Sequence, residues 1–200
     1  MYKRQQYRVG TKNLNSFSST VSPIQRDPLK NILLCGYWPP SNECIRPFST
    51  NETLNPEGWI GDNWEERGYD IHAYFPEFSD PDCENCGQGD GDLEVDYQDT
   101  SEDWWNIVDS INPVAIITFS RGGMDYRWEI EWMCTNWEES EWIADFEEPL
   151  YPTPSPPDST YPQNTPRYSS LPMDSIYSAV SLSLIHISEP TRLGMISYAV

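Results

Sequence analysis

Length, composition and charge already limit what this chain can be. It has 200 residues, a formal net charge of −20 at pH 7, 38% hydrophobic residues, nine Trp and twelve Tyr. This length suits one α/β domain, and so many aromatic residues exclude a disordered acidic chain. The negative charge disfavours nucleic acid and anionic membrane surfaces as partners, and no apolar run approaches the roughly 18 residues of a membrane span.

Both ends of the chain carry segments that look foreign to the rest. Residues 1–5 and the stretch that starts at Ser183 resemble translated sequencing-library adapter, and such scars are left out of fold reasoning. We expect residues 1–30 to form a flexible arm, because they are polar and show no apolar period. Residues 31–180 are expected to form the domain, and residues 181–200 an adapter-derived tail.

Residues 31–37 and 69–75 predict the first two strands. The earlier segment, Asn-Ile-Leu-Leu-Cys-Gly-Tyr, is a short apolar run that is typical of a buried parallel strand. Pro39-Pro40 is expected to end it sharply. In the later segment apolar residues alternate with polar ones, which indicates a strand with one buried face.

Between these strands the sequence predicts a loop and one helical turn. Residues 41–57 contain prolines and no apolar period, so we expect a loop there. Trp59, Ile60 and Trp64 share one side of a helical turn, and Gly68 is placed to end that turn.

Residues 76–99 are rich in acidic side chains and predict a long loop before a helix. Thr100 with Asp103 resembles a capping box. Trp104 and the apolar residues four and seven positions later form one face of a helix. Asn112-Pro113 is expected to close this helix.

After this helix the sequence predicts further strands and one more helix. Residues 114–119 predict a third buried strand and residues 120–123 a turn. The alternation within residues 130–134 predicts a further strand. Residues 149–172 are rich in proline and are expected to be irregular, whereas residues 171–180 are suited to begin another helix.

Strands that alternate with helices predict an α/β fold, a three-layer αβα sandwich with a mostly parallel sheet that is incomplete at the C-terminus. Folds of this kind bind ligands beyond the carboxyl ends of their strands. The candidate segments by this geometry are residues 37–41, 72–77 and 120–131.

Four groups of residues stand in an order that a known family shares. They are residues 33–40, with an aromatic turn after the first strand; Asn55-Pro56; residues 115–123 followed by 130–136; and residues 143–145 followed by 168–172. In this order they resemble the motifs of the pyroglutamyl peptidase I family of cysteine peptidases. The resemblance covers about residues 31–180.

The resemblance implies a chemistry and roles for three residues. Members of the family remove an N-terminal pyroglutamyl group through a thioester, which requires a thiolate, a histidine and an acid that holds the imidazole. Glu131 stands at the place of the family's acid, and Tyr37 and Trp38 at the turn that grips the lactam ring. The family's cysteine and histidine follow the Ser-Leu-Pro helix, where this sequence resembles adapter.

We therefore expect a peptide substrate for the parent protein, no cofactor, and no activity of this chain itself. His72 is the one histidine outside the tail, and it is expected to be structural, as are Cys35 and Cys134. Cys134 lies three residues from Glu131, and on a strand such residues point to opposite faces.

The rival interpretation is a non-enzymatic acidic module that binds calcium weakly through residues 79–96. Counted from Asp90, this loop lacks the Gly and Glu positions of an EF-hand. Cys83 and Cys86 form a single CxxC, which leaves a disulfide or a free thiol pair open and disfavours zinc. The family is mostly cytosolic, whereas a disulfide and high acidity would suit an exported protein, so the sequence leaves the compartment and the oligomeric state open.

Overall fold

The computed structural model describes the greater part of the expected domain. The described residues are 29–80, 83, 86–121, 130–135, 138–153, 158–160 and 162–179. The expected arm up to residue 28 and the expected tail lie outside them, as do residues 122 and 123 of the expected turn.

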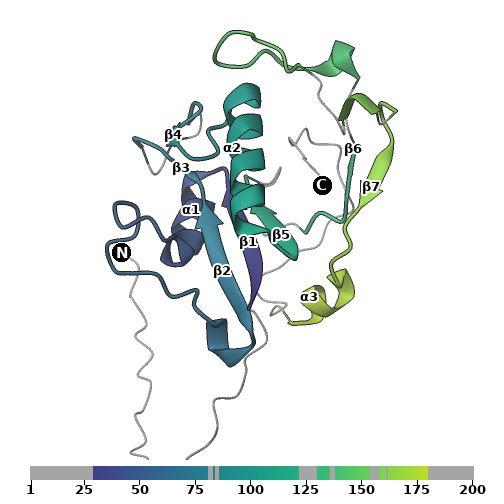
Figure 1. The fold of residues 1–200 in the computed structure, drawn as a ribbon. Coiled ribbons are helices and arrows are strands. Elements are labelled where there is room, and N and C mark those ends of the chain that lie inside the picture. Colours follow the sequence, from purple (N-terminus) through teal and green to yellow (C-terminus); the bar gives the residue numbers. More distant parts are fainter. Residues whose placement is uncertain are drawn as a thin grey trace, which may run out of the picture.

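A parallel sheet of three strands organises the fold (Figure 1). Its central strand β1 (Lys30–Gly36) pairs in parallel with β2 (Tyr69–Tyr74) on one side and with β5 (Ala115–Phe119) on the other. These are the three strands that the sequence predicts. The protein is therefore a mixed α/β structure whose principal sheet is parallel.

Helix α2 (Tyr97–Ile111) covers one face of this sheet (Figure 1). Its Trp104 and Ile107 are buried against Leu33 and Cys35 of β1, and Leu93 from the preceding loop completes the cluster. Burial of a large apolar side chain contributes roughly 1.5–3 kcal/mol, so these contacts hold α2 on the sheet. The apolar face predicted from Trp104 onward is confirmed.

The opposite face is covered by α1 (Pro39–Ile45) and by the 3₁₀ turn η1 (Arg46–Phe48). Ile45 of α1 is buried against Leu34 of β1 and against the inward-facing residues of β2 and its end, Ile71, Ala73 and Phe75. The alternation predicted for residues 69–75 thus places its apolar half on this face.

The loop expected at residues 41–57 is wrong for its first part. Pro39 and Pro40 stand at the first two positions of α1, where a missing N–H costs nothing and the fixed φ suits the helix. The prolines end β1 and at the same time begin a helix. Sequence reasoning used only the first of these two effects.

The helical turn expected from Trp59, Ile60 and Trp64 is also wrong. Ile60 is 55% exposed, and the 3₁₀ turn η2 (Trp64–Glu66) contains Glu65 at a φ of 50°. Trp59 lies beside β2 instead, where its indole N–H donates to the carbonyl of Ile71 at 2.8 Å. Ile71 in turn donates its backbone N–H to Gly61 at 2.9 Å, which covers the outer edge of β2.

Strand β5 is an edge strand of the described sheet, and its residues are half-buried or exposed. Val114, just before it, is 59% exposed. The third strand is present as expected, but its burial is only partial, because β5 has a neighbour on one side within the described chain.

Two small antiparallel ladders accompany the main sheet. β3 (Pro76–Glu77) pairs with β4 (Asp90–Gly91) inside the expected acidic loop, and β6 (Met133–Thr135) pairs with β7 (Pro166–Tyr168). Strand β7 lies within the proline-rich stretch that was expected to be irregular.

The remaining elements are short. They are the 3₁₀ turns η3 (Glu139–Glu141) and η4 (Asp158–Thr160) and the helix α3 (Met173–Ala179), which confirms the helix expected near the end of the domain. In Figure 1 the β6–β7 ladder and α3 lie on the β5 side of the sheet, away from β2. None of the described helices is long and apolar enough to cross a membrane.

The start of α2 differs from the predicted capping box. Asp96 is the N-cap, and its carboxylate accepts from the backbone N–H groups of Gln98 at 3.0 Å and Asp99 at 3.4 Å. Thr100 is buried inside the helix, and its hydroxyl donates to the carbonyl of Glu94. Asp103 accepts from the N–H of Leu93 at 2.7 Å. Both residues of the predicted box therefore hold the preceding loop.

We expect Asp96→Ala to lower the free energy of unfolding by about 1–2 kcal/mol, as for other lost N-caps. Asp96→Asn keeps a side-chain acceptor and should lose far less. Urea unfolding followed by circular dichroism measures both variants. Equal losses of unfolding free energy in the two variants would show that Asp96 does not stabilise the protein through this cap.

Candidate functional site

The carboxyl ends of β1 and β5 bring four of the expected site residues to one edge of the sheet. Gly36 and Phe119 are partners in the parallel register, and the N–H of Tyr37 donates to the carbonyl of Phe119 at 2.9 Å. The guanidinium of Arg121 lies over the indole of Trp38, 6.0 Å from the ring centroid. Tyr37 and Trp38 from one segment thus meet Ser120 and Arg121 from another at the sheet edge where parallel α/β folds bind ligands.

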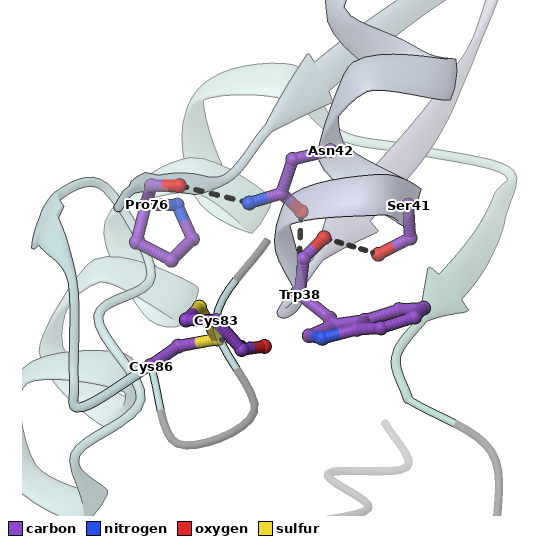
Figure 2. The surroundings of a disulfide bond; sticks show 6 residues. All are labelled: Trp38, Ser41, Asn42, Pro76, Cys83 and Cys86. Atoms are coloured by element: carbon purple, nitrogen blue, oxygen red, sulfur yellow. Dashed lines mark hydrogen bonds between the residues drawn. A yellow bond between two sulfur atoms is a disulfide. The ribbon is translucent and has the colours of Figure 1, made fainter. Parts of the chain in front are cut away.

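Asn42 fixes the turn that carries Trp38, and sequence reasoning missed it. Its side-chain oxygen accepts from the backbone N–H of Trp38 at 3.4 Å, and its amide nitrogen donates to the carbonyl of Pro76 at 2.8 Å. Figure 2 shows Asn42 between these two groups, with the hydroxyl of Ser41 donating to the carbonyl of Trp38. Asn42 is 2% exposed, so this buried amide joins the ends of β1 and β2.

Gly36 leaves the space that Asn42 occupies. A Cβ added at Gly36 would collide with the side-chain oxygen of Asn42 and would lie 3.0 Å from the Ile45 side chain. Helix α1 can therefore begin so close to the end of β1 only because residue 36 has no side chain. A Gly followed by a proline pair and an Asn was the sequence signal that could have indicated this arrangement.

The Cys83–Cys86 disulfide flanks the same turn. The two cysteines are bonded in the structure, which resolves the choice between a disulfide and a free thiol pair. In Figure 2 the disulfide lies near Pro76 on one side and near the Trp38 indole on the other. The indole N–H of Trp38 is buried and has no hydrogen-bond acceptor within the described part of the chain.

Glu131, the expected acid, belongs to a different unit. It is exposed and lies two residues before β6, which pairs with β7 in a small ladder outside the parallel sheet. The neighbouring carbonyl of Trp132 accepts from the N–H of Ser169 at 2.9 Å. Residues 122–129, which connect Arg121 to this ladder, lie outside the described residues.

Two further motif residues of the resemblance have clear structural contacts. Asn55 is buried, and its amide donates to the carbonyls of Pro47 at 3.2 Å and Ser49 at 2.9 Å, which closes the loop after η1. Asp145 accepts the backbone N–H of Tyr97 and so lies at the start of α2. Neither residue lies at the edge formed by Trp38 and Arg121.

His72 and the free cysteines lie in different surroundings. His72 is half-buried on β2 and stacks on Trp59 with ring centroids 5.2 Å apart and planes 24° apart. Cys35 is buried in the core, and this burial raises the pKa of its thiol to about 12, which excludes a thiolate nucleophile there. Cys134 is half-buried on β6, and Cys44 is exposed on α1.

Two carboxylates of the expected calcium loop, Glu94 and Asp96, accept hydrogen bonds from the backbone. Glu94 accepts from the N–H of Gly91 at 2.8 Å, while Asp96 caps α2 and also accepts from Glu147 at 3.3 Å. Burial and the nearby Asp103 raise the pKa of Asp92. Among the described residues, no group of three or more His, Cys, Asp or Glu side chains is arranged to hold a metal ion.

Comparison with known proteins identifies no relative of this chain. No family model, no curated protein and no solved structure matches it.

We expect Gly36→Ala to destabilise the fold by about 1–3 kcal/mol, as other overpacked positions do, because its Cβ would displace Asn42. In an Asn42→Ala background the same change should cost less, since the colliding oxygen is gone. Urea unfolding of the four proteins of this cycle measures the coupling. Additive effects would contradict direct contact between the two positions.

His72 should make the fold less stable in mild acid. Burial lowers the pKa of its imidazole, against a smaller opposing effect of Asp70. The folded state therefore disfavours the proton, so the contribution of His72 is present above the ordinary pKa of about 6.5 and is lost as pH falls.

The variant His72→Phe keeps a ring against Trp59 and cannot titrate. Its melting temperature should fall less than that of the wild type between pH 8 and pH 5. Parallel pH profiles for the two proteins would show that His72 does not cause the dependence.

Proposed function

We propose that this chain comes from a divergent pyroglutamyl-peptidase-like protein with a three-layer α/β fold and a ligand site at the carboxyl edge of β1 and β5. The observation that carries the proposal is the position of the Tyr37–Trp38 turn, which is hydrogen-bonded to the end of β5 and stacked with Arg121. Apolar clusters on both faces of the sheet support the layered architecture.

The proposed reaction is acyl transfer from an N-terminal pyroglutamyl group. A cysteine thiolate attacks the carbonyl of the pyroglutamyl–peptide bond, a histidine takes the thiol proton and gives it to the leaving amine, and water then hydrolyses the thioester. Glu131 would orient the histidine, and the aromatic rings of Tyr37 and Trp38 would pack against the lactam.

This chain is proposed to bind such a ligand without cleaving it. By resemblance, the nucleophile and the histidine belong in the region where residues 181–200 stand. Cys35 does not replace the nucleophile, since its burial in the core and its raised pKa keep it protonated. The exposed position of Glu131 is compatible with an imidazole supplied by a later segment.

The rival calcium-binding module finds less support. Three acidic side chains in or beside the loop, Glu94, Asp96 and Asp103, accept hydrogen bonds from backbone N–H groups, so these carboxylates hold the loop and cap α2. We therefore propose no second function.

The test begins with the source gene, sequenced through both ends of the segment. The proposal expects a reading frame that continues after about residue 180 and encodes a Cys and then a His. The extended protein should hydrolyse a pyroglutamyl-aminocoumarin substrate, and Glu131→Gln should reduce its kcat by about 10²–10⁴-fold, as expected for loss of the group that orients a catalytic histidine.

Glu139→Gln is the matched control, because this exposed carboxylate lies at the start of η3. It should leave kcat unchanged. A continuation without Cys and His, or full activity in Glu131→Gln, would contradict the proposal.

A further inference from the structure

We propose that the Cys83–Cys86 disulfide is a reversible redox site, which a dithiol reduces and a disulfide oxidant re-forms while the α/β domain stays folded. The site lies in the loop between β3 and β4 and is independent of the proposed peptidase function.

The bond lies where a reductant can approach the loop. Two residues separate the cysteines, the spacing of the redox-active pair in disulfide oxidoreductases. Cys83 and Cys86 are each half-buried, and neither belongs to the two apolar clusters that the described residues form on the sheet. Thiol–disulfide exchange requires access to one of the sulfurs, and the partial exposure of both residues favours it.

The loop is also held by contacts other than the disulfide. At its base β3 pairs with β4 in an antiparallel ladder. Near its end the N–H of Val95 donates to the carbonyl of Gln88 at 2.7 Å. A cross-link across so few residues removes little conformational entropy from the unfolded chain. Reduction is therefore expected to leave the parallel sheet and α2 in place.

An acceptor for the reduced Cys86 thiol is already in position. The sulfur of Cys86 lies 3.4 Å from the carbonyl oxygen of Cys83. In the disulfide this sulfur carries no hydrogen, whereas a thiol there can donate its S–H to that oxygen. The N–H of Cys83 donates to the carbonyl of Asp80 at 3.4 Å, a contact that does not involve the sulfur. The main chain therefore needs no rearrangement to accept the reduced pair.

The proposed step is a two-electron exchange with a dithiol. One thiolate of the reductant attacks a sulfur of the pair, the protein S–S bond breaks, and a mixed disulfide forms while the other cysteine leaves as a thiolate. The second thiol of the reductant then displaces the bound cysteine and closes the reductant's own disulfide. The two protons of the dithiol end on Cys83 and Cys86, and a disulfide oxidant reverses the exchange.

The experiment follows each cysteine of the folded 200-residue chain by alkylation. The oxidised protein is incubated without denaturant in increasing concentrations of dithiothreitol and alkylated with iodoacetamide, and peptide mapping by mass spectrometry identifies the labelled residues. We expect Cys83 and Cys86 to be labelled together, and only after reduction, while the circular dichroism spectrum stays that of the folded protein. Treatment with oxidised glutathione, once the dithiothreitol is removed, should protect both residues again.

Two free cysteines serve as controls within the same protein. Cys44 is exposed on α1 and should be labelled with or without dithiothreitol. Cys35 is fully buried in the core and should stay unlabelled as long as the domain is folded.

Two variants test whether the fold needs the bond. Cys83→Ser/Cys86→Ser should fold and melt at most about 8 °C below the oxidised wild type, the scale for a cross-link that closes so short a loop in a domain of this size. Dithiothreitol should not change its melting temperature. Cys44→Ser is the matched control, since it removes an exposed thiol outside the pair, and its disulfide should be reduced and re-formed as in the wild type.

Three results would overturn the proposal. If the pair resists reduction until Cys35 is labelled too, or if the double variant does not fold, the disulfide is structural. If the pair is labelled before any reductant is added, the protein contains no such disulfide. Each of these results leaves the proposed peptidase function untouched.

Discussion

The rest of the structure depends on the central position of β1. Its neighbours β2 and β5 pair with it on both sides, and its residues Leu33 and Cys35 are fully buried against α2. Because both edges and both faces of the strand are occupied, the position of its end at Gly36 is fixed relative to the ends of the neighbouring strands. The turn that follows is held in part by the main chain of β5, through the bond from the N–H of Tyr37 to the carbonyl of Phe119.

The buried amide of Asn42 holds the turn after β1 against the end of β2. It bonds the main chain on either side, at Trp38 and at Pro76, and thereby joins the exits of β1 and β2 beneath α1. A buried amide whose two ends are satisfied by backbone groups costs little, whereas one left with an open end would be expensive. Gly36 is the complementary requirement, since its missing side chain makes room for the amide.

The elements that the sequence predicted correctly are those with a strong local period. The apolar run at β1, the alternation in β2 and the helical face from Trp104 each depend on residues close together in the chain. One failure has a long-range cause. Trp59 appeared to belong to a helical turn because of its spacing, yet it lies along β2, ten or more residues away in sequence, and a distant partner leaves no periodic trace.

The sequence by itself therefore determined an α/β chain, its three parallel strands and its principal helix, because side-chain periodicity is a property of neighbouring residues. It also indicated that the aromatic residues Tyr37 and Trp38 follow the end of the first strand. Only the tertiary structure decided that Asp96 caps α2, that Asn42 is buried between two strand exits, and that Arg121 lies over Trp38. The positions of Asn42 and Arg121 are set by a long-range hydrogen bond and by strand register, which bring together residues that no local pattern connects. The Asp96 cap is local, but the sequence offered Thr100 with Asp103 as a competing cap.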